Sequence, residues 1–148
     1  MKDSKRRLIA IDIENICKKP IIDIDDVAKA RNMIEVLCSP QDHDAVIIGT
    51  SGSTNFLAAG IAWSKPLRVY RNGHNGADLA LIEKISTYDF ETISEVIFFG
   101  GDGIYAPLVD EIAQMGIPVC VYAYSSGLSS RIVASVQSNN NCTISIAA

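Results

Sequence analysis

Short apolar runs rich in β-branched residues recur along the chain, and most of them show no alternation with polar residues. Such runs are typical of parallel strands that are covered on both faces of a sheet. The pattern predicts strands at five places, namely 8–11, 45–48, 67–70, 96–99 and 118–122. The stretch 142–146 alternates apolar and polar residues, which predicts a strand at the edge of the sheet.

Helical patterns lie between the predicted strands. They predict helices from Asp23 or Asp25 to about Cys38, over 55–63 with Ser53 as the capping residue, after 75–76, from 105–107 to Gly116, and over 128–136. This β-α-β alternation predicts an α/β protein, a three-layer sandwich around a mostly parallel sheet of five or six strands. A chain of 148 residues is the length of one domain. We therefore expect a single domain over 1–148, with 1–6 as a basic N-terminal arm.

Composition narrows the class of protein. A hydrophobic fraction of 48% and a mean hydropathy of +0.19 exclude a disordered chain. Glycine, proline and polar residues interrupt both long uncharged windows, 45–64 and 112–130, so we expect no membrane span. The four cysteines have no CxxC spacing, which favours a reducing compartment. These features together predict a soluble, cytoplasmic protein.

Acidic residues outnumber basic ones, with 17 Asp and Glu against 13 Lys and Arg and a net charge of −4. This balance argues against a polybasic nucleic-acid binder, whose affinity comes from neutralising phosphates. The positions of three acids change that reading. Asp12 ends the first predicted strand, Asp102 follows the fourth, and Asp78 begins the helix after the third.

Ligands of parallel α/β sheets bind beyond the carboxyl ends of the strands, where these three acids are expected to converge. Carboxylates held together repel one another unless a cation neutralises them. Mg²⁺ or Mn²⁺, which prefer oxygen ligands, fit such a cluster, and the predicted chemistry is metal-assisted hydrolysis of a phosphodiester. The alternative for each acid is local, because Asp102 can serve in a glycine-rich turn and Asp78 can stabilise the first turn of a helix.

Three sequence blocks carry a resemblance to a known family. They are 8–15, 76–81 and 99–109, and their order and spacing resemble the signature blocks of the NYN domain, a branch of the PIN-like nuclease superfamily. The resemblance covers nearly the whole chain. It implies a Rossmann-like fold with an acidic, Mg²⁺- or Mn²⁺-binding site that cleaves RNA.

The resemblance also implies roles for individual residues. Asp12 and Asp102 match the metal-binding acids of the family, Asp78 matches the acid of its G-x-D block, and Asn15 matches the Asn of its first block. Many members have a second acid at the position of Ile104, and its absence here is the main departure. We therefore expect a ribonuclease, and as the alternative an inactive NYN-fold module that binds RNA, a nucleotide or a protein.

Residues near the predicted acids are candidates for binding substrate. Thr50 and Ser51 stand at the start of a predicted helix, where free backbone N–H groups could bind a phosphate. Arg71 and His74 precede Asp78 and could contact an RNA phosphate or protonate a leaving oxygen. The alternative for Thr50 and Ser51 is ordinary capping of the helix. The alternative for Arg71 and His74 is a solvated loop without a ligand.

Two further possibilities follow from single segments. The tetrapeptide 100–103 also occurs in lipid and sugar-nucleotide kinases, but the other nucleotide-binding blocks of those enzymes are missing here. The edge strand predicted at 142–146 could pair with a second copy in a homodimer. Since the chain is acidic, we expect RNA as the partner to be bound weakly, with the site loops or a protein partner supplying affinity.

Overall fold

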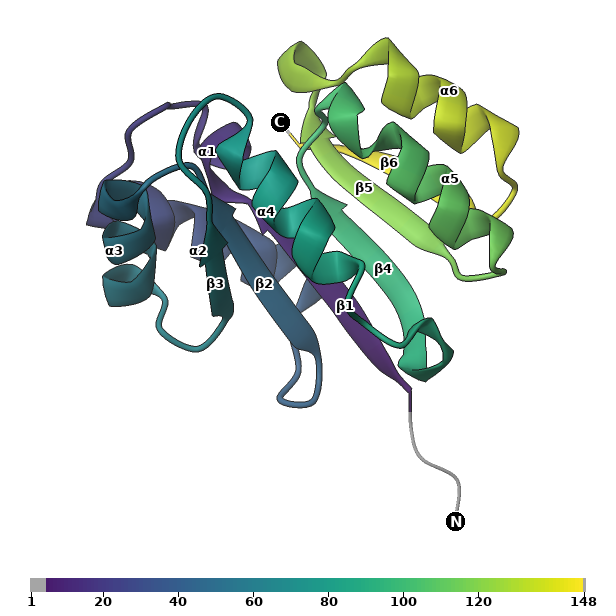
Figure 1. The fold of residues 1–148 in the computed structure, drawn as a ribbon, viewed down its shortest axis with the longest axis horizontal. Helices are drawn as coiled ribbons and strands as arrows, with labels where there is room; N and C mark the ends of the chain where they lie inside the picture. The colour runs from purple at the N-terminus through teal and green to yellow at the C-terminus, as the bar shows by residue number, and fades with distance from the viewer. Residues whose placement is uncertain (1–4, 148) are drawn as a thin grey trace.

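The computed structural model describes residues 5–147, and its strands form one sheet (Figure 1). The strands are β1 (Arg6–Asp12), β2 (Ala45–Thr50), β3 (Leu67–Tyr70), β4 (Ile93–Phe99), β5 (Val119–Tyr124) and β6 (Cys142–Ala147). Their order in the sheet is β3-β2-β1-β4-β5-β6, and every neighbouring pair is parallel. The predicted strands are therefore confirmed, with the sheet fully rather than mostly parallel over the described residues.

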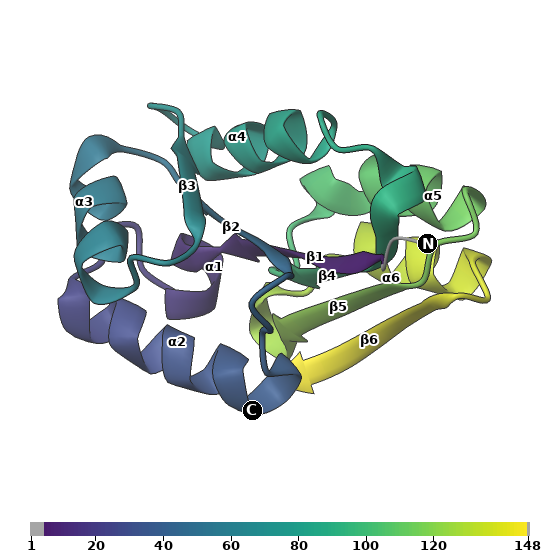
Figure 2. The ribbon, with the colours of Figure 1, turned by 90° about the horizontal axis from the view of Figure 1, so that it is seen from below.

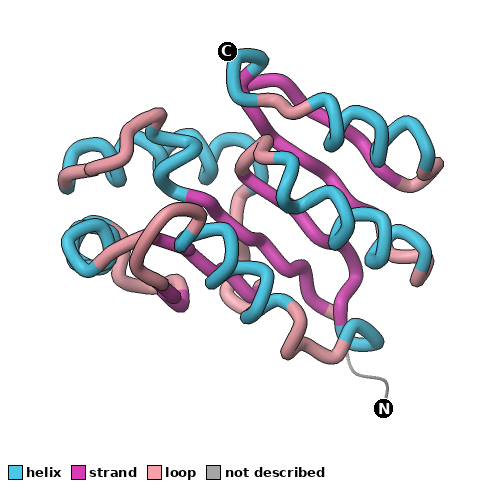
Figure 3. The backbone as a smooth tube through the Cα atoms, turned by 45° about the horizontal axis from the view of Figure 1, so that its top comes forward, coloured by secondary structure: helices cyan, strands magenta, loops and turns pink. Residues whose placement is uncertain are grey.

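Helices cover both faces of this sheet. They are α1 (Ile13–Cys17), α2 (Ile24–Cys38), α3 (Ser53–Ala62), α4 (Gly76–Ile85), α5 (Ala106–Gln114) and α6 (Ser130–Ser138), with short 3-10 turns at Phe90–Thr92, Gly103–Tyr105 and Ser125–Gly127. Figure 2 shows α4, α5 and α6 on one side of the sheet and α1, α2 and α3 on the other. In Figure 3 the strands form a magenta layer between the cyan helices. The predicted three-layer, Rossmann-like sandwich is confirmed.

The central strand β1 explains why the predicted strands lack polar alternation. Leu8 and Ala10 belong to the core beneath α4, α5 and α6, whereas Ile9 and Ile11 belong to the core beneath α1, α2 and α3. All four side chains are at most 1% exposed. Since both faces of the strand are buried, both sets of alternating positions are apolar.

The structure corrects two details of the predicted helices. The segment after β1 forms the five-residue helix α1, which is too short for its periodicity to be read from the sequence. Helix α3 begins at Ser53, and Gly52 is its N-cap without a side-chain hydrogen bond. The prediction of Ser53 as the capping residue is therefore wrong, because Ser53 already lies inside the helix. Asp23 caps α2, as one of the two predicted alternatives required.

The predicted basic arm, 1–6, can be checked only at residues 5 and 6, because 1–4 lie outside the described residues. Its boundary at residue 6 is wrong, since β1 already begins at Arg6. The Arg6 guanidinium lies 5.6 Å from the centre of the Tyr88 ring, and Arg7 forms an ion pair of 2.7 Å with Asp44. Both arginines therefore have partners in the fold.

Strand β6 pairs with β5 alone, which confirms the edge strand predicted at 142–146. The homodimer through this edge stays a prediction. Over residues 5–147, no helix has the length and apolar character needed to span a membrane.

The strand order fixes where a ligand site is expected. From β1 the chain proceeds to β2 and β3 on one side, and β4, β5 and β6 extend the sheet on the other. The direction of winding thus reverses between β1 and β4. In open parallel sheets the crevice beyond the carboxyl ends of two such strands is the usual ligand site. Asp12 is the last residue of β1, and Asp102 follows the end of β4 at this crevice.

Candidate active site

Asp12 stands at the turn from β1 into α1. Its side chain is 4% exposed, and its Oδ1 accepts a hydrogen bond of 3.3 Å from the backbone N–H of Asn15. The Asn15 side chain in turn accepts a hydrogen bond of 3.4 Å from the backbone N–H of Gly101. Asn15 therefore joins the end of β1 to the loop after β4, on the two sides of the reversal point.

A single tyrosine connects two of the predicted acids. The Tyr105 hydroxyl oxygen lies 3.1 Å from Asp12 Oδ2 and 3.0 Å from Asp78 Oδ1. Tyr105 is 1% exposed and Asp78 is 5% exposed, so these contacts are shielded from water. A phenol carries one proton and can donate fully to only one carboxylate. The second carboxyl group satisfies the hydroxyl best when it is itself protonated and donates to it.

Burial and mutual proximity shift the acidity of this pair. Burial raises the pKa of Asp12 well above its ordinary range, and hydrogen bonding with Asp78 and the charge of Asp78 raise it further. Burial also raises the pKa of Asp78, with a further contribution from the charge of Asp102. Burial and the two neighbouring carboxylates raise the pKa of Tyr105 as well. The pair therefore retains a proton at a pH where exposed carboxyl groups are ionised.

The two acids open onto a cleft of about 330 Å³. Six of the eight predicted site residues line this cleft, namely Asp12, Asn15, Ser51, His74, Asp78 and Asp102. The structure thus brings together side chains from the ends of β1, β2 and β4 and from the start of α4. Asp102 also accepts a hydrogen bond of 3.2 Å from the backbone N–H of Ile104, as its alternative role in a turn predicts.

Two predicted substrate-binding residues lie elsewhere. Thr50 is completely buried, and its hydroxyl donates to the carbonyl of Gly52 at 3.5 Å. Arg71 is exposed and forms an ion pair of 2.7 Å with Glu83, beside a different surface depression. The structure places neither side chain in the cleft, because one packs inside the sandwich and the other is held by an acid on α4.

One of the backbone N–H groups that were predicted to bind a phosphate at the start of α3 already has a partner within the protein. The Glu14 carboxylate accepts hydrogen bonds from the backbone N–H of Ser51 at 2.6 Å and from Asn55 Nδ2 at 2.9 Å. The N–H of Ser51 is therefore used by a protein acid. Glu14 thereby holds α1 against the start of α3.

A close approach of the backbone places Asp78 in the cleft. A Cβ atom at Gly76 would overlap the carbonyl oxygen of Arg71, so only glycine lets this loop cross the start of α4. Asn75 precedes it with a φ of 61°, a left-handed conformation that Asn tolerates. The loop therefore turns directly into α4, and Asp78 stands in the first turn of that helix.

No site role was predicted from the sequence for Tyr105 or for Asn55. The 3-10 turn Gly103–Tyr105 directs Tyr105 inward beneath the cleft, a local geometry that the sequence does not signal. Asn55 is 4% exposed and also donates to the Pro20 carbonyl at 2.9 Å. Asn55 follows Ser53 and Thr54 in the first turn of α3, where polar residues are ordinary, so the sequence carries no signal for this buried role.

Asp12, Asp78 and Asp102 offer carboxyl oxygen atoms to a cation in the cleft. Among residues 5–147, however, no three or more His, Cys, Asp or Glu side chains form a group that could hold a metal ion. Asp12 and Asp78 form the tight pair, and Asp102 stands at its margin as a neighbouring charge. A metal site built from all three acids stays a prediction.

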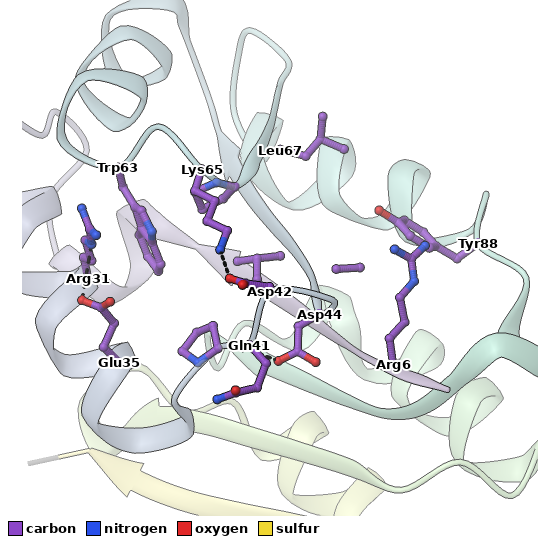
Figure 4. Close-up of a pocket in the computed structure, with 14 residues that line it drawn as sticks. Arg6, Arg31, Glu35, Gln41, Asp42, Asp44, Trp63, Lys65, Leu67 and Tyr88 are labelled. Atoms are coloured by element: carbon purple, nitrogen blue, oxygen red, sulfur yellow. Dashed lines mark hydrogen bonds and ion pairs between the residues drawn. The ribbon is translucent and has the colours of Figure 1, made fainter. Parts of the chain in front are cut away.

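A second pocket lies at the opposite end of the sheet, where β1, β2 and β3 begin (Figure 4). Its volume is about 410 Å³, larger than that of the cleft. Its charged side chains mostly neutralise one another, since Lys65 lies 2.5 Å from Asp42 and Arg31 lies 3.3 Å from Glu35. The predicted site residues all lie outside it, so we place the candidate active site in the smaller cleft.

Comparison with known proteins adds support for the fold. No protein-family model and no curated protein matches the sequence. A solved structure described as a "putative MAR1 ribonuclease" from Leishmania major is similar, with a TM-score of 0.52 and 14% identity over 97% of this chain and 79% of that chain. The nicotinamidase SaPncA from Staphylococcus aureus has a TM-score of 0.44 and 12% identity over 97% of this chain and 100% of that chain. At 14% identity the first similarity shows a shared α/β fold. The TM-score of the second is too low for an inference.

Proposed function

We propose that this chain is a metal-dependent ribonuclease of the NYN type that hydrolyses RNA phosphodiester bonds in the cleft. The observation that carries the proposal is the buried Asp12–Asp78 pair, joined by the Tyr105 hydroxyl at the reversal point of a parallel sheet. The fold similarity to a protein described as a ribonuclease is consistent with it.

The cleft residues suit a hard divalent cation. Mg²⁺ is usually bound by one or two carboxylates, and water and substrate phosphate complete its coordination. In this proposal Asp12 and Asp78 hold Mg²⁺ or Mn²⁺, and Asp102 is a third ligand or orients water. When bound, the cation would offset the carboxylate repulsion and polarise the scissile phosphate. Burial and the neighbouring Asp78 raise the pKa of Asp12, and a bound cation would favour its ionised form.

The remaining cleft residues have distinct tasks in this proposal. Tyr105 fixes the two carboxyl groups, and the backbone N–H of Asn15 fixes the outer oxygen of Asp12. His74 is exposed at the cleft, where its imidazole can act as a general acid toward a leaving oxygen. Ser51 lines the same cleft, and in this proposal its hydroxyl donates to a phosphate oxygen.

The test is cleavage of a fluorescently labelled single-stranded RNA with Mg²⁺ or Mn²⁺ and with EDTA. We expect cleavage with metal, none with EDTA, and none for Asp102→Asn. Asp42→Asn is the matched control, because Asp42 is exposed at the opposite end of the sheet and the same charge is removed. If Asp102→Asn and the EDTA-treated protein cut RNA as well as the untreated wild type, the proposal is wrong.

One observation favours a second function, a binding module without catalysis. Ile104 occupies the position where the NYN resemblance expects a second acid, so this chain has one acid fewer near Asp102 than that resemblance implies. In that case RNA affinity would be unchanged by chelation, and neither metal would support cleavage. The same assay, combined with a binding measurement in EDTA, separates the two functions.

A further inference from the structure

A second depression adjoins the cleft on the side of β5 and α6. Its volume is about 630 Å³, and it shares Asn15, Asn75 and Asp102 with the cleft. Its far wall is formed by the 3-10 turn after β5 and the start of α6. We call this depression the groove. Because the two share a wall, an extended molecule lying over the Asp12–Asp78 pair continues directly into the groove.

Arg131 is the one cation among the ten residues that line the groove, and Asp102 is the one acid. The Arg131 side chain is exposed, and within residues 5–147 its guanidinium takes part in no ion pair and no hydrogen bond. Arg71, in contrast, is paired with Glu83. Arg131 therefore offers an uncompensated positive charge beside an acidic cleft.

Glycine at position 103 allows Arg131 to lie there. A Cβ atom at Gly103 would lie 3.2 Å from Arg131 Cδ and 2.6 Å from the Ser129 hydroxyl oxygen. The arginine stem thus packs over the residue that directly follows Asp102. Arg131, which belongs to α6, therefore lines the groove together with Asp102, which the groove shares with the cleft.

The rest of the groove combines hydroxyl groups with an apolar surface. Ser126 supplies an exposed hydroxyl, and Ile104 and Leu128 are partly buried apolar side chains that pack on the core. A guanidinium with neighbouring hydroxyls is a typical phosphate-binding set. An apolar surface beside it suits an unstacked base, which single-stranded RNA presents and duplex RNA does not.

We propose that Arg131 binds a phosphate of single-stranded RNA beside the carboxylate cleft, and that the groove binds the adjoining nucleotide. This inference rests on the proposed function, and it places the RNA substrate across the cleft and along the groove. It also accounts for how an acidic chain binds RNA, since the repulsion of the cleft is offset by an arginine beside it. Arg131 is in this view a positioning residue for the substrate.

Fluorescence anisotropy with a short, labelled oligouridine in EDTA tests the groove without cleavage. We expect Arg131→Gln to weaken binding about fivefold and to make the negative slope of log affinity against log salt shallower by roughly 0.7, the loss of one phosphate contact on a single strand. Arg131→Lys should keep that slope. Arg31→Gln, which removes the same charge at the opposite end of the sheet, should change affinity less than about twofold.

An unchanged affinity and salt slope for Arg131→Gln would overturn the inference, and so would a wild-type protein that does not bind the oligouridine. A melting temperature equal to that of the wild type shows that the exposed substitution leaves the fold intact. If Arg131→Gln binds RNA more weakly and the wild type cleaves RNA with neither metal, RNA binding in the groove is supported and the proposed ribonuclease activity is rejected. Cleavage by the wild type with full affinity in Arg131→Gln supports the nuclease and rejects the groove.

Discussion

The carboxyl groups of Asp12 and Asp78 share one hydroxyl group, that of Tyr105, inside the protein. Tyr105 is 93 residues from Asp12 and 27 residues from Asp78 along the chain. This three-residue cluster therefore depends on the tertiary fold, because β1 contributes Asp12, α4 contributes Asp78 and the turn after β4 contributes Tyr105. The cluster lies where the strand order reverses. Its contacts therefore affect both the stability of the buried core and the properties of the cleft.

Tyr105→Phe should destabilise the protein. The substitution keeps the ring, which packs 5.5 Å from that of Phe98, and removes the hydroxyl from two buried carboxyl groups. Leaving a buried polar group unpaired costs about 1–3 kcal/mol, and the free energy of unfolding should fall by that amount. Urea denaturation at neutral pH measures it.

Tyr70→Phe is the control for this substitution. Tyr70 is 46% exposed, and its ring packs on Phe56 without a recorded hydrogen bond from the hydroxyl in the described residues. Its loss should change stability by less than about 0.5 kcal/mol. Equal effects of the two substitutions would mean that the Tyr105 hydroxyl does not hold the carboxyl groups.

Asp12→Asn should stabilise the protein at neutral pH in EDTA. The folded protein raises the pKa of Asp12, so between its ordinary value of 3.8 and the raised value the native state binds more protons than the unfolded state. Stability therefore falls as pH rises through the raised pKa, and this penalty is absent below about pH 4. The introduced amide cannot ionise, and it can still accept from Asn15 and donate to Asp78.

Thermal unfolding across pH 4 to 8 measures this effect, with Asp42→Asn as the comparison. The exposed ion pair with Lys65 lowers the pKa of Asp42, so its contribution has the opposite sign and is lost as pH falls. The gap between Asp12→Asn and wild type should widen as pH rises. A constant gap would show that ionisation of Asp12 does not oppose folding.

The sequence predicted much of this architecture because burial on both faces leaves a clear signal. Apolar runs predicted five of the strands, alternation predicted β6, and the acids at strand ends predicted the cleft. Tertiary partners explain the failures. Thr50 packs inside the sandwich and Arg71 is paired with Glu83, and neither orientation follows from position in the chain. The bridging role of Tyr105 needs three distant elements to meet, which no local pattern records.

Mn²⁺ should raise the melting temperature of the wild type, and EDTA should reverse the rise. A ligand that binds only the native state adds about 2.7 kcal/mol at a concentration one hundred times its Kd. We expect no rise for Asp12→Asn or Asp78→Asn, and a normal rise for Asp42→Asn. The rise should be smaller at pH 5 than at pH 8, because the cation competes with the proton retained by the pair. A full rise in Asp12→Asn would contradict the assignment.

Ile104→Asp tests the cleft and the groove together. It restores the acid that the NYN resemblance expects, and it adds a negative charge to the groove that contains Arg131. The added carboxylate should increase the Mn²⁺-dependent rise in melting temperature, because a further oxygen ligand strengthens cation binding. In EDTA the same variant should bind single-stranded RNA about fivefold more weakly, because the new charge opposes the phosphate contact of Arg131.

Ile104→Asn is the matched control, since it brings the same size and polarity without the charge. It should reproduce any loss of packing with the core but neither the gain in cation binding nor the full loss of RNA affinity. If Ile104→Asp weakens RNA binding no more than Ile104→Asn, charge in the groove does not govern binding, and the path over Arg131 is wrong. If cation binding also stays unchanged, position 104 lies beyond reach of the metal, and the carboxylates of Asp12 and Asp78 must suffice.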